Sequence, residues 1–158
     1  MSTTRRDFLK GGALAGAGLV IAFHEPGTAR ATDLAAKDTL APNAYLRVAP
    51  DGTVTVMIAR SELGQGTSTA LAMLVAEELE ADWRKVRIEQ ASPGPAYGEM
   101  STGGSNSIRS LWKPMRKAGA QARELLVSAA ANQWKVDRAT CQAASGEVAH
   151  AASGRRLG

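Results

Sequence analysis

The sequence predicts an α+β fold in which a small mixed or antiparallel sheet carries two main helices. Alternating, β-branched segments at residues 45–48 and 53–59 indicate strands, and a shorter alternating segment follows at 85–91. Apolar residues recur at helical spacing across residues 67–82 and again from 108 to 134. The predicted order of elements is therefore strand, strand, helix, strand, helix, strand.

The N-terminal residues resemble a twin-arginine export signal. The motif TRRDFLK at 4–10 precedes a weakly apolar, glycine-rich run at 11–23, and ARA at 29–31 has the small-x-small pattern of a signal-peptidase site. The run is too short for a spanning helix, which needs about 20 apolar residues. We expect a signal peptide at 1–31 and export by the twin-arginine route to the periplasm, with membrane association as a further option. A basic arm before a Gly/Ala linker is the alternative.

The mature chain begins with a linker and a hairpin. Residues 32–43 are polar and aperiodic and are predicted to be a linker, which leaves residues 44–158 as the folded part. Pro50-Asp51-Gly52 provides turn residues between the first two strands. The helix that follows is expected to bury an apolar face made of Leu71, Leu74, Val75, Ala76 and Leu79.

The second helix contains Pro114, so it is predicted either to kink at this residue or to begin there. Its expected buried face consists of Ile108, Trp112, Met115, Gly119, Ala122, Leu126 and Ala129. Residues 141–158 are predicted to start another hairpin whose second arm is barely begun. That hairpin would leave a strand edge open, and the chain alone would then be only marginally stable.

Composition excludes several classes of function. The chain has 158 residues, enough for one ordinary domain, and its net charge of +4 is dispersed, without a basic patch interleaved with aromatics. No nucleic-acid partner is therefore expected. A single cysteine, Cys141, excludes an internal disulfide, and the distant His24 and His150 form no zinc motif. We predict no metal-ligating residue in this chain.

Gly64-Gln65-Gly66 lies at the junction between the second strand and the first helix. Glycines there indicate a sharp turn or the close approach of a ligand. The helix has no acid in its first turns, so its positive end is expected to be free for an electron-rich ligand, although Glu62 nearby would weaken the attraction for phosphate. Gln65 offers an amide donor and acceptor to a heterocycle. A tight turn with an incidental glutamine is the alternative.

A second loop, Thr102-Gly103-Gly104-Ser105, opens onto the second helix. Its hydroxyls and glycine amides, with Arg109 one turn on, suit a pyrophosphate. The charged residues between Ser101 and Arg123 are all positive. A flexible Ser/Gly loop beside a solvated basic face is the alternative. If both loops bind a ligand, they hold the two ends of one extended cofactor.

These motifs resemble a known family. GQG after a strand, the helix TALAMLVAEELEADW and the segment STGGSNSIRSLWKPMRKAGAQARELLVSAAANQW are similar to the molybdopterin-binding subunit of the xanthine dehydrogenase and aldehyde oxidase superfamily. Within it, the isoquinoline 1-oxidoreductase beta-subunit group is the best match, and its members often carry a twin-arginine signal. The resemblance extends from Asn43 to Gly158. It implies that the predicted fold is part of a larger molybdopterin-binding domain.

The resemblance also implies roles for individual residues. In the family the glutamine between the glycines contacts the pyranopterin of the molybdenum cofactor, which assigns that contact to Gln65, with Gly64 and Gly66 beside it. The Ser/Thr/Gly loop holds the phosphates of the dinucleotide. This role points to Thr102, Gly103, Gly104 and Ser105. The implied cofactor is molybdopterin cytosine dinucleotide.

The implied reaction is the hydroxylation of an N-heteroaromatic or an aldehyde with oxygen derived from water. Electrons would pass to a small partner subunit with [2Fe-2S] clusters, and a cytochrome c subunit is a further candidate partner. The family's catalytic base is a glutamate that lies far beyond the equivalent of Gly158. We therefore expect an N-terminal piece without a catalytic residue, inactive by itself. A non-catalytic exported α+β binding module is the alternative.

Overall fold

The computed structural model describes residues 19–22, 44–93 and 97–158. Strands β2 (Ala44–Val48) and β3 (Val54–Ile58) form the predicted antiparallel hairpin, with Leu46 opposite Val56. The Asp51 carboxylate accepts the Thr53 amide at 2.8 Å and so stabilises the turn between the strands. The predicted linker at 32–43 lies outside the described residues.

Two further strands complete this sheet, whose order is β1-β2-β3-β4. β4 (Val86–Gln90) pairs with β3 in parallel, and β1 (Leu19–Ala22) pairs with β2 antiparallel. The sheet is therefore mixed, which is one of the two arrangements that the sequence predicts. β1 falls within the predicted export signal, most of which lies outside the described residues.

Helix α2 (Thr67–Leu79) connects β3 to β4, which makes a β-α-β unit. Its buried side chains include Leu71, Val75 and Leu79, as expected from their spacing. The helix ends at Leu79, three residues before the predicted end, because Glu80 takes a left-handed conformation with φ of 59° and its N–H bonds back to the last turn. A single 3₁₀ turn at Trp83–Lys85 then leads into β4.

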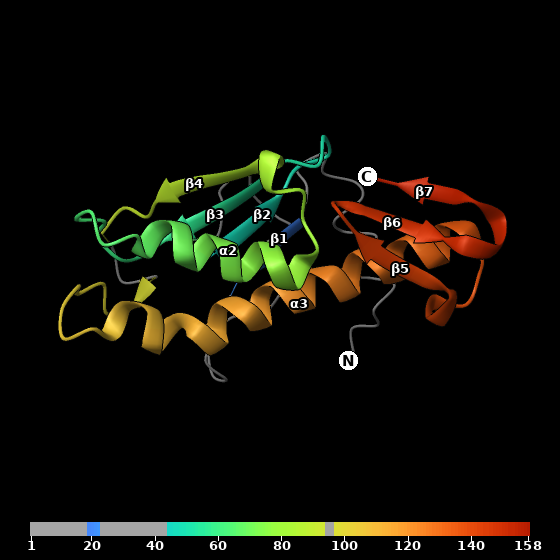
Figure 1. Cartoon of the computed structure of the whole chain (residues 1–158). Helices are drawn as coiled ribbons and strands as arrows, with labels where there is room; N and C mark the ends of the chain where they lie inside the picture. The colour runs from blue at the N-terminus through green and yellow to red at the C-terminus, as the bar shows by residue number, and fades with distance from the viewer. Residues whose placement is uncertain (1–18, 23–43, 94–96) are drawn as a thin grey trace.

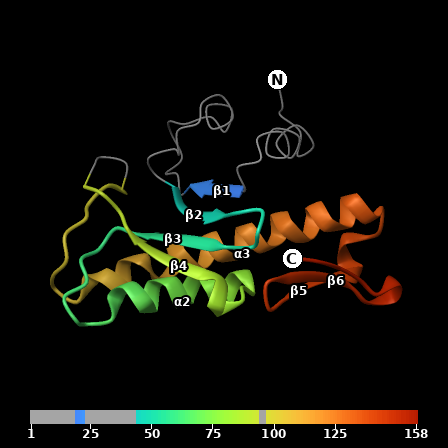
Figure 2. The ribbon, with the colours of Figure 1, turned by 90° about the horizontal axis from the view of Figure 1, so that it is seen from above.

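Helix α3 (Asn106–Trp134) runs alongside α2, and both helices begin at the same end of the molecule (Figures 1 and 2). It begins well before Pro114, so the prediction of a start at that proline is wrong. The predicted face is correct at Met115, Gly119 and Ala122 but wrong at Trp112, whose residue surface is 46% exposed. Trp112 instead lies under the Arg116 guanidinium, 5.8 Å from the ring centroid.

Gly119 lets the two helices approach closely. A Cβ atom placed on it would lie 2.5 Å from the carbonyl oxygen of Val75 and 2.9 Å from Cβ of Glu78. Both atoms belong to α2, and the flanking α3 positions Ala118 and Ala122 are small and fully buried. The closest part of the α2–α3 contact therefore has no room for a larger residue.

The C-terminal residues form a second sheet, a meander of β5 (Cys141–Ala144), β6 (Glu147–His150) and β7 (Arg155–Leu157). The expectation of a hairpin lacking its second arm is wrong, because β5 pairs with β6 along its whole length and β6 pairs with β7. The meander has its own small core against the C-terminal half of α3, in which Cys141 and Val148 pack on Val127, Ala130 and Ala131. The α+β class is confirmed, with two sheets instead of one.

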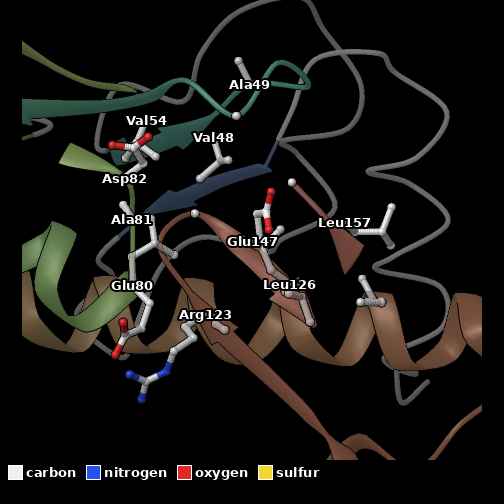
Figure 3. Close-up of a pocket in the computed structure, with 18 of the residues that line it drawn as sticks. Val48, Ala49, Val54, Glu80, Ala81, Asp82, Arg123, Leu126, Glu147 and Leu157 are labelled. Atoms are coloured by element: carbon white, nitrogen blue, oxygen red, sulfur yellow. The ribbon is translucent and has the colours of Figure 1, made fainter. Parts of the chain in front are cut away.

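A pocket of about 320 Å³ opens between the two sheets (Figure 3). Its lining is mostly apolar and includes Val54, Leu126 and Leu157. Glu80, which follows the last turn of α2, also lines the pocket, so the pocket lies at the opposite end of α2 from the Gly-Gln-Gly loop. Neither helix in the described ranges has an apolar stretch long enough to cross a membrane.

Candidate functional site

The two glycine-rich loops leave the same edge of the first sheet. Because β3 and β4 are parallel, their carboxyl ends lie side by side. The segment after β3 leads through Gly64-Gln65-Gly66 into α2, and the segment after β4 leads through Thr102–Ser105 into α3. Both loops lie at the end of the molecule away from the β5–β7 meander (Figure 1). This edge of a β-α-β unit is where such folds commonly bind ligands.

Direct contacts hold the two loops together. The Ser61 amide donates to the Thr102 hydroxyl oxygen at 2.8 Å. The Arg60 side chain, in a residue only 6% exposed, donates to the carbonyl oxygen of Glu99 and reaches the Ser110 hydroxyl at 3.4 Å. Arg60 therefore links the end of β3 to the second loop and to the first turns of α3.

A tyrosine pair attaches the start of the second loop to the sheet. The Tyr45 hydroxyl donates to the carbonyl oxygen of Tyr97 at 3.2 Å, and the two rings meet edge to face with centroids 5.2 Å apart. Burial raises the pKa of the Tyr45 hydroxyl, so it stays a neutral donor at physiological pH.

Glu62 occupies the N-terminal end of α2. Its Oε1 accepts the amides of Gly64 and Gly66 at 2.9 and 2.8 Å, and its Oε2 accepts the amide of Ser68 at 2.9 Å. These amides, the Ser68 amide first, hold the pKa of Glu62 below its ordinary value. The expectation of an unneutralised positive end is therefore wrong. The sequence indicated that Glu62 lies near the loop, but not that its carboxylate occupies the N-terminal end of α2.

Gln65 shapes its own loop. Its Oε1 accepts the Leu63 amide at 2.5 Å and its Nε2 donates to the carbonyl oxygen of Ser61 at 2.8 Å. Each contact uses one of two available donors or lone pairs, which leaves one N–H and one lone pair on an exposed side chain. Gly64 and Gly66 have φ of +95° and +78°, and a Cβ on either would meet nothing within 4 Å. The turn therefore accounts for both glycines, and both positions face open space.

The second loop presents an end of α3 that no side chain of the N-cap residue closes. Gly104 and Ser105 have φ of +57° and +54°, and Ser105, the N-cap residue, makes no side-chain cap bond. The first turn of α3 contains no acid, and Arg109 is exposed there with its Nη2 3.5 Å from Oδ1 of Asn106. This set of donors suits an anion better than the corresponding end of α2. Glu99 is the nearby acid, and its carboxylate accepts the Ser101 hydroxyl at 2.5 Å.

The structure thus brings the predicted site residues to one edge. It places Gly64, Gln65 and Gly66 in one exposed loop and Gly103, Gly104, Ser105 and Arg109 at the start of the adjacent helix. Thr102 is half-buried and connects the two loops. Within the described part of the chain, no three His, Cys, Asp or Glu side chains are grouped to hold a metal ion.

Sequence reasoning missed Arg60 and the role of Glu62. A charged residue directly after the apolar strand at 53–59 was a signal for Arg60, because an arginine so close to a core must find several acceptors. Glu62 stands two and four residues before the glycines, a spacing at which a carboxylate reaches local backbone amides.

Comparisons with known proteins agree on one family. The model of the molybdopterin cofactor-binding domain matches residues 2–157. A membrane-bound aldehyde dehydrogenase [pyrroloquinoline-quinone] of Gluconacetobacter polyoxogenes is 37% identical over 99% of this chain and 20% of its own length. The beta subunit of isoquinoline 1-oxidoreductase from Brevundimonas diminuta is 40% identical over 73% of this chain and 16% of its own length.

A solved structure has the same arrangement. The crystal structure of quinoline 2-oxidoreductase from Pseudomonas putida 86 superposes with a TM-score of 0.55 and 25% identity, over 67% of this chain and 13% of that one. The chain thus spans a fifth or less of the relatives that it matches. With the family model covering nearly every residue, the chain belongs to the molybdopterin cofactor-binding domain family of the xanthine dehydrogenase superfamily.

Proposed function

We propose that this chain supplies the two cofactor-holding loops of the large subunit of a molybdenum hydroxylase. The observation that carries the proposal is the Ser61–Thr102 hydrogen bond. It joins the two glycine-rich loops that follow the carboxyl ends of the parallel strands β3 and β4. The cofactor is a molybdopterin, for which the cytosine dinucleotide is the form we propose. When bound, it supplies the oxidation chemistry, and this chain supplies binding and orientation.

The residues divide between the two ends of such a cofactor. Gln65 presents its remaining N–H and lone pair to the edge of the pterin ring. The amides of Gly103, Gly104 and Ser105 and the Arg109 guanidinium bind the phosphates at the start of α3. Thr102 fixes the distance between the ends by holding Ser61.

We also propose an activity for the whole protein from the names of its relatives. Two of them are named for aldehyde or isoquinoline oxidation, so we propose aldehydes or N-heteroaromatics as substrates. Electrons would pass to a [2Fe-2S] partner subunit and, in some assemblies, onward to a cytochrome c subunit. We also propose export to the periplasm by the twin-arginine signal at 1–31, with residues 44–158 as the cofactor-binding part.

The test is cofactor content in the large subunit that carries this chain, co-expressed with its iron–sulfur partner. Molybdenum is measured by mass spectrometry, the pterin by the fluorescence of its oxidised form, and the nucleotide by the CMP released on acid hydrolysis. Gln65→Ala should lower molybdenum and pterin together. Gln121→Ala, an exposed glutamine on α3, is the matched control. Unchanged cofactor in Gln65→Ala would refute the proposed role of the loop.

A further inference from the structure

Glu62 binds three backbone amides that a ligand would otherwise use. Ser68 is the second residue of α2, and its amide is one that side chains commonly cap. Gly66 is the N-cap residue and Gly64 lies outside the helix, so an ordinary capping side chain would not reach their amides. A carboxylate that collects all three sits where a phosphate sits in an anion-binding loop.

The other helix provides the contrast within the same site. At the N-terminal end of α3, the N-cap side chain makes no cap bond, no acid lies in the first turn, and Arg109 is exposed. The two loops differ, although both precede helices that start at the same edge of the sheet. One helix end already holds a negative charge from its own chain, and the other lacks a side-chain cap.

We infer that Glu62 is a specificity-determining residue that acts as an internal anion. Its carboxylate excludes phosphate from the Gly-Gln-Gly loop and leaves Gln65 to meet a neutral heterocycle. An extended cofactor is thereby bound in one direction, with its phosphates at α3 and its uncharged ring at α2. The identity of the ligand rests on the proposed function. The exclusion of phosphate by Glu62 does not.

Glu62 acts through the loop amides and is a positioning residue, so its test must measure more than folding. Inorganic phosphate is titrated into the ¹⁵N-labelled chain, with sodium chloride at equal ionic strength as the salt reference. Amide shifts are followed at two sets of residues: Gly64, Gly66 and Ser68 in the α2 set, and Gly103, Gly104 and Ser105 in the α3 set. Glu62→Ala removes the carboxylate, and Glu62→Gln keeps its shape without the charge. Glu77→Ala is the control, an exposed glutamate on the same helix with the same change in net charge.

In the native chain and in Glu77→Ala, phosphate should shift the α3 set and leave the α2 set unmoved. In Glu62→Ala, phosphate should also shift the α2 set. If Glu62→Ala disturbs folding, Glu62→Gln carries the same expectation. The inference is overturned if native α2 amides respond to phosphate, or if they stay silent in both uncharged variants. If phosphate does not shift the α3 amide signals of the native chain, the result would instead count against phosphate binding at α3 in the proposed function.

Discussion

Replacement of Gly119 by alanine tests how closely α2 and α3 pack. The new Cβ would stand 2.5 Å from the Val75 carbonyl oxygen, 0.9 Å inside the 3.4 Å at which ordinary contacts begin (3.4 less 2.5). Because Val75 contributes a backbone atom, the helices themselves must move apart. Overpacking of this kind costs about 1–3 kcal/mol, and we take the upper end. The better helix propensity of alanine returns about 1 kcal/mol.

The expected net loss for Gly119→Ala is about 2 kcal/mol in the free energy of unfolding. For a chain of this size that loss corresponds to a melting temperature lower by about 4–8 °C. Thermal and urea denaturation followed by far-UV circular dichroism measure it. Gln121→Ala, exposed on the same helix, should stay within about 0.5 kcal/mol of the native chain. A Gly119→Ala variant that melts above the native chain would show that propensity alone governs the site and would refute the close-packing argument.

Three further predictions concern the loops and the core. Thr102→Val removes the acceptor of the Ser61 amide, so hydrogen exchange at Ser61 should accelerate while Thr102→Ser stays native; equal rates in both variants would contradict the bridge. The amides that donate to Glu62 lower the pKa of its carboxyl group below the ordinary value of 4.5. Glu62 should therefore protect these amides from hydrogen exchange at pH 4.5 and above, and the protection should be lost only as the pH falls through the lower pKa of the folded chain. Exchange rates corrected for pH measure this, and protection already lost above 4.5 would disprove it. Leu71→Ala, at a fully buried position, should cost about 2–5 kcal/mol in urea denaturation, and a loss below 1 kcal/mol would mean that α2 is not part of the core.

The hairpin, the β4 strand and both helices could be predicted from sequence because period and turn chemistry are local properties. The buried face of α3 could be predicted only in part, since Trp112 and Met115 both fit a helical stripe and the position of α2 decides which of them is covered. A hairpin was expected at 141–158, but its complete pairing and the third strand, β7, were not predicted, because strands of three or four residues give weak alternation.

The positions of the two loops along the chain could be predicted from sequence, but the contacts between them could not. Glycines next to helix starts indicated both loops. The parallel pairing of β3 and β4, which brings the loops together, was not among the predictions. The reach of Glu62 and Arg60 depends on side-chain rotamers and on a loop distant in sequence, which no pattern of spacing reports.

The parallel pairing of β3 and β4 fixes the spacing between the points at which the two loops leave the sheet. Neighbouring strands stand about 4.8 Å apart because of their backbone hydrogen bonds, whatever side chains they carry. The spacing between the starts of the two loops is therefore set by backbone pairing and does not depend on the side chains of the two strands. Substitutions in the two loops can then change the surface that they present without changing the spacing of the strands that carry them.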